Sequence, residues 1–308
     1  MRKKETPEEK RRRFMENARK AVASAYESEE HAIINAINTY NSIEKARNLM
    51  FERLEEWYSI YFPELRLANP VSYANFVINF GRDKNAADPE KMTEMLGEKV
   101  ESLQEAIGKS IGKEPKPEEY ESLRQLAESQ IGLQKVSQNL ESYIEQSCKR
   151  AMPNISYLID TKIAAELLAK AGSLERLAMF PAGTIQLLGA EKALFKHLKY
   201  HSRPPKYGIL FRLPQVSNAA KYDKGRIARV YATKISIAAK ADAFSKNFIA
   251  KELKEQLEKS LAHARNHAER DESKQKQSFE KGGGFRREGF TPRHGHGNRG
   301  NRYGSRRH

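Results

Sequence analysis

The chain has 308 residues and carries 55 lysine and arginine residues against 40 aspartate and glutamate residues, a formal net charge of +15. This excess favours a polyanionic partner such as nucleic acid. The single cysteine, Cys148, excludes an internal disulfide framework and is typical of a reducing intracellular compartment. No apolar run approaches the length of about 18 residues that a membrane span needs, so we expect an intracellular protein with no membrane association.

Three apolar stripes with three- and four-residue spacing predict long helices in the first half of the chain. Each stripe is narrow, so the economical way to bury them is against one another, as an antiparallel coiled-coil-like hairpin. A homodimer through the coiled coil is equally compatible with narrow stripes. The stripe residues are, in chain order, Ile33, Ile37, Tyr40, Ile43, Met50, Leu54, Trp57 and Tyr61, then Met92, Leu96, Val100, Leu103, Ile107 and Ile111, then Leu123, Leu126, Leu133, Val136, Leu140 and Tyr143.

After about Pro153 the composition changes to shorter helices rich in alanine and leucine, with glycine and proline between them. This part is expected to form a compact domain whose last helix runs from about Lys224 to Asn247, and a charged helix follows. The predicted divisions are a basic helical N-terminal extension (1–30), a coiled-coil region (31–152), the compact domain (153–247), the charged helix (248–270) and a tail (271–308).

The tail is rich in glycine, arginine, asparagine and histidine, with isolated aromatic residues. It cannot bury enough apolar surface to offset its ordering entropy, so we expect it to be disordered. Arginine- and glycine-rich segments with spaced aromatic residues commonly bind RNA loosely through charge and stacking. A solubilising tail without a specific ligand is the alternative.

A basic helix is predicted to begin after Gly189, which can break the preceding chain. Starting the helix at Ala190 places Glu191 in the first turn, where the helix dipole favours a carboxylate. Three lysines then share one face and two leucines share another, by which the helix is expected to dock on its domain. An ordinary solvated lysine face is the alternative. These residues are Lys192, Lys196, Lys199, Leu194 and Leu198.

Two further basic elements follow this helix. The first is a loop stiffened by Pro204 and Pro205, which suits phosphate contact together with stacking on a base or ribose. The second is the start of the last helix of the compact domain. Three basic elements in one small domain favour nucleic-acid binding over chance solvation. The candidate residues are His201, Arg203, Lys206 and Tyr207 in the loop, and Arg226 and Arg229 in the helix.

Five stretches resemble the Nop-domain family, the scaffold proteins of box C/D ribonucleoproteins and a related splicing factor. The similarity spans roughly Ile33 to Lys246, and its GAEKALF core, followed by PKYG and KGRIAR, is highly specific. The stretches are EEWYSIYFPEL (55–65), MPNISYLID (152–160), AKAGSLERLAMFPAGTIQLLGAEKALFKHLK (169–199), PPKYGILF (204–211) and DKGRIARVYATKISIAAKADAF (223–244).

The resemblance implies an all-α fold, in which a long antiparallel coiled-coil arm precedes a compact helical Nop domain and a disordered basic tail. It also implies an RNA-binding scaffold that recognises a kink-turn RNA together with a small ribosomal-type protein bound to it, as in box C/D particles that guide ribose methylation or in related RNA processing. Such a protein would be cytoplasmic in an archaeon and nuclear in a eukaryote. The residues that match the family motifs are Gly189, Ala190, Glu191, Lys192, Lys196, Lys206, Tyr207, Arg226 and Arg229, with Lys199 and His201 nearby; Leu194 and Phe195 are expected to pack while the lysines face RNA.

The N-terminus departs from the family pattern. Box C/D scaffolds carry a fibrillarin-docking domain before the coiled coil, whereas about thirty residues precede it here. Fibrillarin docking is therefore doubtful, and the layout is comparable to that of the splicing-factor branch.

Catalysis is not expected, and neither is a cofactor or a metal. Gly108, Lys109 and Ser110 resemble the end of a phosphate loop, but Leu103 stands where the motif needs glycine. His263 and His267 are four residues apart on a helix without an obvious third ligand, and the tail histidines His294, His296 and His308 do not form a defined site. The remaining alternatives are a coiled-coil adaptor whose basic domain meets acidic proteins and a general RNA-binding protein without kink-turn specificity.

Overall fold

The computed structural model describes residues 6–27, 29–81 and 100–264, which all belong to one compact unit. These residues form helices and connecting loops without any strand, so the predicted all-α fold is confirmed. The predicted tail, its histidines, the end of the charged helix with His267, and the stripe residues Met92 and Leu96 lie outside the described residues. In the part of the chain that the structure describes, no helix is both long and apolar enough to cross a membrane.

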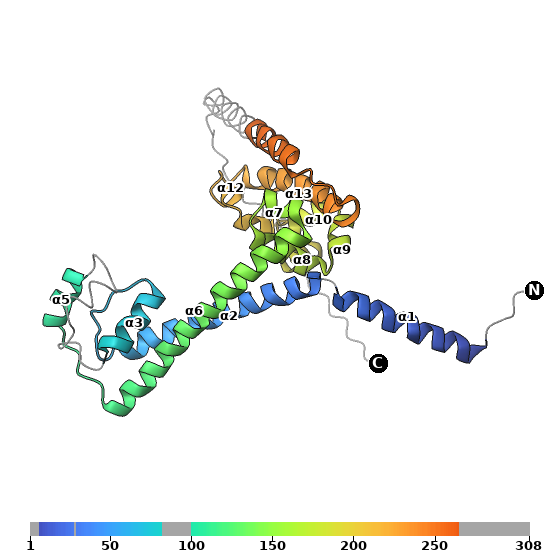
Figure 1. Ribbon diagram of the computed structural model, residues 1–308. Coiled ribbons are helices and arrows are strands. Elements are labelled where there is room, and N and C mark those ends of the chain that lie inside the picture. Colours follow the sequence, from blue (N-terminus) through green and yellow to red (C-terminus); the bar gives the residue numbers. More distant parts are fainter. Residues whose placement is uncertain (1–5, 28, 82–99, 265–308) are drawn as a thin grey trace, which may run out of the picture. The chain divides into compact units, whose positions relative to one another are not determined.

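A hairpin of two long helices forms the arm, as Figure 1 shows. Helix α2 (Glu29–Tyr58) packs along α6 (Pro117–Ala151) in the antiparallel sense. Proline and glutamate residues begin α6, where they suit the first turn of a helix. The antiparallel coiled-coil arm is therefore confirmed. Helix α1 (Pro7–Glu27) precedes α2, and the shorter helices α3 (Pro70–Phe80) and α5 (Val100–Gly108) lie between the two long helices in the chain.

The residues that fill the arm differ in part from the predicted stripes. Trp57 is exposed and Tyr58 is buried in its place, while Val136 and Tyr143 are exposed on α6. On α6 the reason is that the buried face includes small and polar side chains, which a pattern of large apolar residues does not indicate. The buried residues of α6 are Leu123, Ala127, Gln130, Ser137, Ile144, Ser147 and Cys148.

Two separate apolar cores result. The core at the loop end of the arm is largely aromatic, with Tyr58, Phe62, Tyr73 and Phe76 in edge-to-face or tilted contact. The other core joins the open end of the arm to the compact helical domain, and Cys148 is buried in it.

The compact domain surrounds one long helix, α13 (Lys224–Lys240), which buries the predicted Ile227, Tyr231 and Ala238. The helix at residues 250–264 packs into the same core through Leu253, Leu257 and Leu261. The other elements are α7 (Pro153–Leu158), α8 (Thr161–Ala171), α9 (Leu174–Met179), α10 (Ala182–Leu187), α11 (Glu191–Tyr200), the 3-10 turn η2 (Ile209–Arg212), α12 (Pro214–Ser217) and the π turn η3 (Ala241–Ser245).

Candidate nucleic-acid interface

Three of the predicted cations meet at one hollow beside the start of α13. The hollow has a volume of about 480 Å³, and Lys206 enters from the loop while Arg226 and Arg229 enter from α13. We call it the basic groove. Its full lining is Gly183, Gln186, Leu187, Pro205, Lys206, Tyr222, Gly225, Arg226 and Arg229. The structure therefore joins two basic elements that are about twenty residues apart in the chain.

A buried glutamine, Gln186, holds the walls of the basic groove together. Its Nε2 atom donates to the carbonyl oxygens of Lys206 at 2.6 Å and of Gly225 at 3.2 Å. Its Oε1 atom accepts from Nε of Arg229 at 3.4 Å. One side chain therefore ties α10, the proline-rich loop and α13 to one another, and it holds the backbone at Lys206 and the guanidinium group of Arg229 in place.

A glycine allows the loop to return against α10. The N–H of Gly208 donates to the carbonyl oxygen of Gln186 at 2.9 Å, and the N–H of Ile209 donates to that of Leu188 at 2.7 Å. A Cβ atom at Gly208 would lie 1.9 Å from the Leu188 carbonyl oxygen, so no other residue fits without moving the backbone. The close approach of the two backbones therefore depends on this glycine.

The arginines of the basic groove are oriented by their neighbours. Arg226 lies 3.5 Å from a carboxylate oxygen of Asp223 and donates to the carbonyl oxygen of Ala264 at 3.3 Å. The side chain of Arg226 remains 41% exposed. Tyr222 is 74% exposed at the same hollow and offers an aromatic face. Charge and an aromatic surface thus occur together, as phosphate and base or ribose contacts require.

The predicted start of α11 is found in the structure. Gly189 has φ of +86°, a left-handed conformation that favours glycine, and α11 follows from Glu191. The Glu191 carboxylate accepts from the N–H of Gly189 at 2.8 Å and lies 3.8 Å from Nζ of Lys170. Partial burial alone would raise the pKa of Glu191, but the backbone N–H groups of Gly189 and Glu191 and the charge of Lys170 lower it overall.

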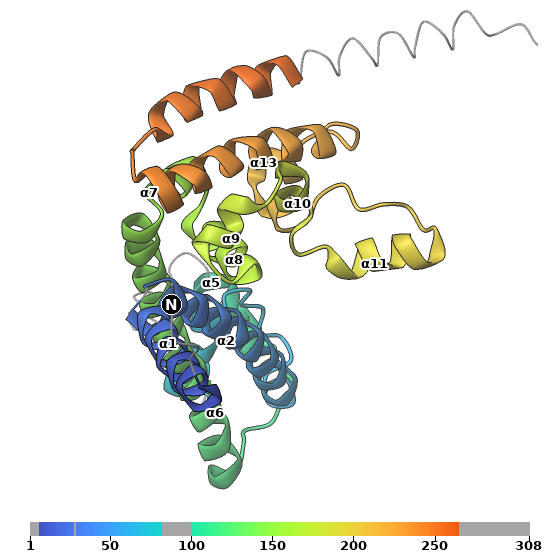
Figure 2. The ribbon, with the colours of Figure 1, turned by 90° about the vertical axis from the view of Figure 1, so that its right-hand side faces the viewer.

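The expected docking of α11 through Leu194 and Leu198 is wrong, because α11 buries no residue. Leu194 is half-buried, and the exposed fractions of Phe195 and Leu198 are 71% and 65%. The helix is fixed at its ends, by the Gly189 turn and by the hydrogen bond between His197 and the Ser202 carbonyl, and not by burial of an apolar face. Figure 2 shows α11 standing apart from the neighbouring helices.

The three lysines of α11 are exposed. Within the described residues, Lys192 and Lys196 have no acidic side chain at ion-pair distance, and Nζ of Lys199 lies 5.2 Å from the ring centroid of Tyr200. His201 is exposed and ends the helix with a left-handed φ of 51°. These cations form a second basic surface, which the loop 201–206 connects to the basic groove.

Tyr207 takes a different position from the other candidates. It is half-buried against the core, and its ring stacks on Phe211 with centroids 4.9 Å apart and planes at 13°. Lys224 places its Nζ atom 5.1 Å from the Phe211 ring centroid and donates to the Ser217 carbonyl oxygen at 2.7 Å. One face of Tyr207 is therefore already covered by the protein.

Sequence reasoning missed Gln186 and Tyr222. Gln186 stands inside an apolar stretch, where a buried amide needs partners from elsewhere in the fold. The feature of the sequence that could have indicated Gln186 is a polar residue on the apolar face of a short predicted helix. Tyr222 precedes the basic start of α13, and its proximity to Lys206 depends on the return of the loop.

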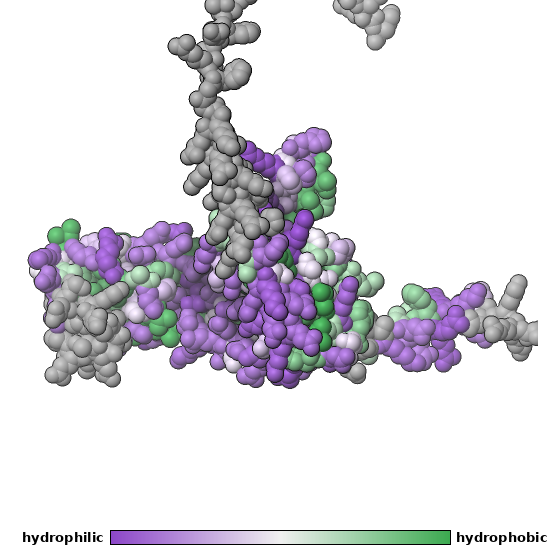
Figure 3. Space-filling view, turned by 90° about the horizontal axis from the view of Figure 1, so that it is seen from above, coloured by the Kyte–Doolittle hydropathy of each residue, from purple (hydrophilic) through white to green (hydrophobic). Residues whose placement is uncertain are grey.

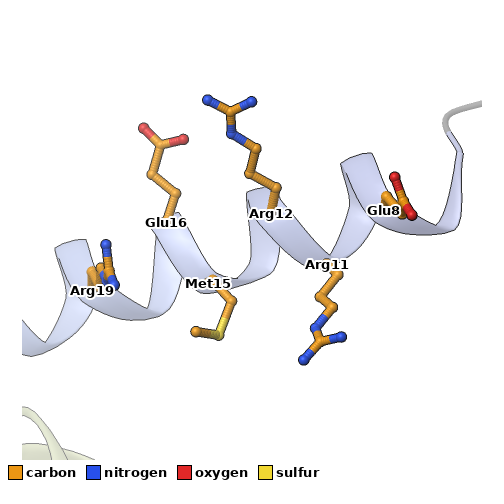
Figure 4. A pocket seen from close by; sticks show the side chains of 6 residues that line it. All are labelled: Glu8, Arg11, Arg12, Met15, Glu16 and Arg19. Atoms are coloured by element: carbon orange, nitrogen blue, oxygen red, sulfur yellow. The ribbon is translucent and has the colours of Figure 1, made fainter.

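Other surface features give no comparable site. The side chains around the hollow on α1 project from one helix in different directions, with Arg11 and Arg12 on opposite sides (Figure 4). The face in Figure 3 is mostly hydrophilic, with small separated hydrophobic areas. Within the described residues, no group of three His, Cys, Asp or Glu side chains could hold a metal ion.

Comparison with protein families gives one match that covers most of the chain. The family model Nop, described as "snoRNA binding domain, fibrillarin", matches residues 39–263. These residues include most of the arm, all of α11 and every residue of the basic groove.

Several curated proteins are similar to this chain. A NOP5 family protein of Methanocaldococcus jannaschii is 36% identical over 252 residues, which cover 81% of this chain and 61% of the relative. Nucleolar protein 58 of Aspergillus fumigatus is 36% identical over 216 residues, covering 69% of this chain and 36% of that protein, and the protein of the same name from Scheffersomyces stipitis is 37% identical with 69% and 42% covered. The chain thus spans less than two thirds of each of these relatives. Among solved structures, a fibrillarin/Nop5p complex matches with a TM-score of 0.43 and 23% identity, covering 84% of this chain and 80% of that one.

Proposed function

Because the chain belongs to the Nop family, we propose that it is an RNA-binding scaffold protein whose basic groove and α11 contact RNA. The family model is described by snoRNA binding, and two of the relatives are named as nucleolar proteins. The observation that carries the proposal is the convergence of Lys206, Arg226 and Arg229 on one hollow fixed by Gln186. Fixed cations beside an aromatic ring suit a folded RNA backbone better than a flexible acidic protein.

The surface of α11 supports recognition of a composite partner, a kink-turn RNA with a small ribosomal-type protein bound to it. Lysines on this helix can meet phosphates, whereas Phe195 and Leu198 are uncovered apolar side chains that suit a protein surface. The RNA alone would contact only the lysines of α11, and the small protein alone would contact only its apolar side chains. Binding should therefore be strongest when both partners are present.

The direct test measures binding of the full chain to kink-turn RNA, to the small protein and to their preformed complex. We expect the complex to bind far more tightly than either component. Equal affinity for a plain RNA duplex would instead indicate general RNA binding. Binding to acidic proteins, with none to the RNA complex, would indicate a coiled-coil adaptor.

A double variant separates the protein contact from the RNA contact. Phe195→Ala with Leu198→Ala should leave the free energy of unfolding within about 0.5 kcal/mol of its original value, since both side chains are exposed. Affinity for the RNA–protein complex should fall about tenfold or more, while binding to the RNA alone stays the same. Met179→Ala, which removes an apolar side chain that is 75% exposed on α9, is the matched control.

We also propose that the arm pairs with a second copy, which would bring two RNA sites into one particle that guides ribose methylation or a related RNA-processing step. Leu49 on α2, and Ile60 and Ile111 in the connections between α2 and α6, are between 53% and 87% exposed, and such side chains suit an apolar interface. Ile60→Glu should then convert a dimer to a monomer in sedimentation velocity. A wild-type monomer at all concentrations would contradict the pairing. A particle of this kind would act in the nucleus of a eukaryote or in the cytoplasm of an archaeon.

A further inference from the structure

Three exposed aromatic side chains lie on α7, on η3 and on the segment after η3, at the C-terminal end of α13 and far from the basic groove. Tyr157 of α7 is 43% exposed, Phe244 of η3 is 61% exposed and Phe248 is 52% exposed. The rings of Tyr157 and Phe248 meet edge to face with centroids 5.7 Å apart. We call these three residues the aromatic patch. The basic groove lies at the other end of α13, and 17 residues of helix correspond to about 25 Å.

A buried polar cluster underneath fixes the segments that carry the aromatic patch. Asp242 is 1% exposed and accepts from the N–H of Asn154 at 3.0 Å, from its Nδ2 atom at 2.7 Å and from the N–H of Ile155 at 3.0 Å. Asn154 also donates to the Asn247 carbonyl oxygen at 2.9 Å and accepts from the N–H of Ile249 at 2.7 Å. Residues before Tyr157 are thereby joined to residues on both sides of Phe244 and Phe248.

The backbone between the two phenylalanines is also unusual. Residues 241–245 form a π turn, and Lys246 follows with a left-handed φ of 57°. Single π turns and left-handed residues other than glycine cost free energy and occur often at functional sites. A satisfied buried network that maintains this turn presents the exposed rings in one arrangement. The rings need little further ordering when a ligand binds.

The charge around the aromatic patch selects the class of ligand. Residues 240–254 carry Lys240, Lys246, Lys251 and Lys254 against Glu252 and the buried Asp242. Nζ of Lys254 lies 5.1 Å from the ring centroid of Tyr157. Alternating lysines and exposed rings are the arrangement that binds single-stranded nucleic acid, because phosphates meet the cations and bases stack on the rings.

We propose that the aromatic patch binds a single-stranded RNA segment that flanks the folded RNA at the basic groove. The inference rests on the proposed RNA-scaffold function and adds a second contact to it. A strand that leaves the folded element along α13 reaches the aromatic patch with its bases unpaired. The patch therefore reads no particular sequence, since every base has a face that can stack.

The test compares two RNAs bound by the full chain. One is a kink-turn RNA in complex with its small protein and with blunt ends, and the other carries a single-stranded uridine extension of about ten nucleotides. We expect the extension to raise affinity about fivefold to tenfold. The double variant Phe244→Ala with Phe248→Ala should abolish that gain and leave binding of the blunt RNA unchanged. Tyr143→Ala removes an aromatic side chain that is 42% exposed on α6 and should keep the full gain.

A second measurement distinguishes this proposal from the proposed function. Binding of an isolated uridine oligomer, weakened by the double variant, supports the aromatic patch even if the kink-turn complex fails to bind. Lys254→Glu should also reduce the affinity gained from the extension. This variant replaces the double variant if thermal unfolding shows that the double variant is destabilised. The proposal is overturned if the extension adds no affinity, if the variants retain the full gain, or if they alter only self-association in sedimentation.

Discussion

The lysines of α11 and the cations of the basic groove belong to the same compact domain, but they are held in opposite ways. Helix α11 buries none of its residues and is fixed only at its two ends. In the basic groove, buried Gln186 donates a hydrogen bond to the backbone carbonyl of Lys206 and accepts one from the guanidinium group of Arg229. The difference shows that a run of lysines identifies a charged surface. Neutral polar residues such as Gln186 determine which charged side chains are held in a fixed position.

The comparison predicts the largest change in stability at Gly208, in the loop that carries Lys206 into the basic groove. Gly208→Ala places a methyl group against the Leu188 carbonyl oxygen and should lower the free energy of unfolding by about 2–3 kcal/mol. RNA affinity should fall with it, because Lys206 precedes this residue. Urea unfolding measures the change. Gly132→Ala in α6, where a Cβ atom meets nothing within 4 Å, should instead stabilise by about 0.5–1 kcal/mol.

The next largest effect is expected at Gln186. Gln186→Leu leaves the Lys206 and Gly225 carbonyl groups without their side-chain donor, so the free energy of unfolding should fall by about 1–2 kcal/mol. Binding through the basic groove should weaken more than the loss of stability explains, since two cations lose their fixed positions. Gln138→Leu changes an exposed glutamine of α6 and should have little effect on either quantity. Equal behaviour of the two variants would remove Gln186 from its positioning role.

On α11 the effect should be on binding alone. Lys192→Ala with Lys196→Ala should lower RNA affinity about tenfold at moderate salt and reduce the slope of log affinity against log salt by about two. The unfolding free energy should stay within about 0.5 kcal/mol, because both side chains are exposed. Lys45→Ala with Lys135→Ala removes two exposed lysines from the arm and should leave the slope unchanged. An unchanged slope in the α11 variant would mean that these lysines do not contact phosphates.

The smallest effect should come from Glu191, where α11 begins. Its pKa is lowered in the folded protein, so its contribution to stability is present above the unfolded pKa and is lost as pH falls through the folded value. Glu191→Gln should cost less than about 0.5 kcal/mol at neutral pH, because the side chain is 46% exposed. The difference from wild type should vanish in acid. Glu52→Gln, at an exposed position of α2, should show no such convergence.

Much of the architecture could be predicted because helices leave a periodic signal. The spacing of Ile33, Ile37 and Leu54 indicated the arm, and the spacing of Ile227 and Tyr231 indicated α13. Individual residues of the arm were not all predicted, since Gln130 and Ser137 are buried although the predicted stripe did not include them, and Val136 of that stripe is exposed. Periodicity gives the direction of a face, but the partner helix decides which side chains along that face are covered.

The sequence by itself determined the helical class, the excess of positive charge, the helix start at Gly189 and the family motifs, because these depend on residue type and local spacing. Only the tertiary structure decided that Lys206 meets Arg226 and Arg229, that α11 stays uncovered, and that Asn154 and Asp242 support an exposed aromatic patch. The physical reason is that each of these features joins residues far apart in the chain. Their distances depend on hydrogen bonds and close backbone approaches that no local pattern records.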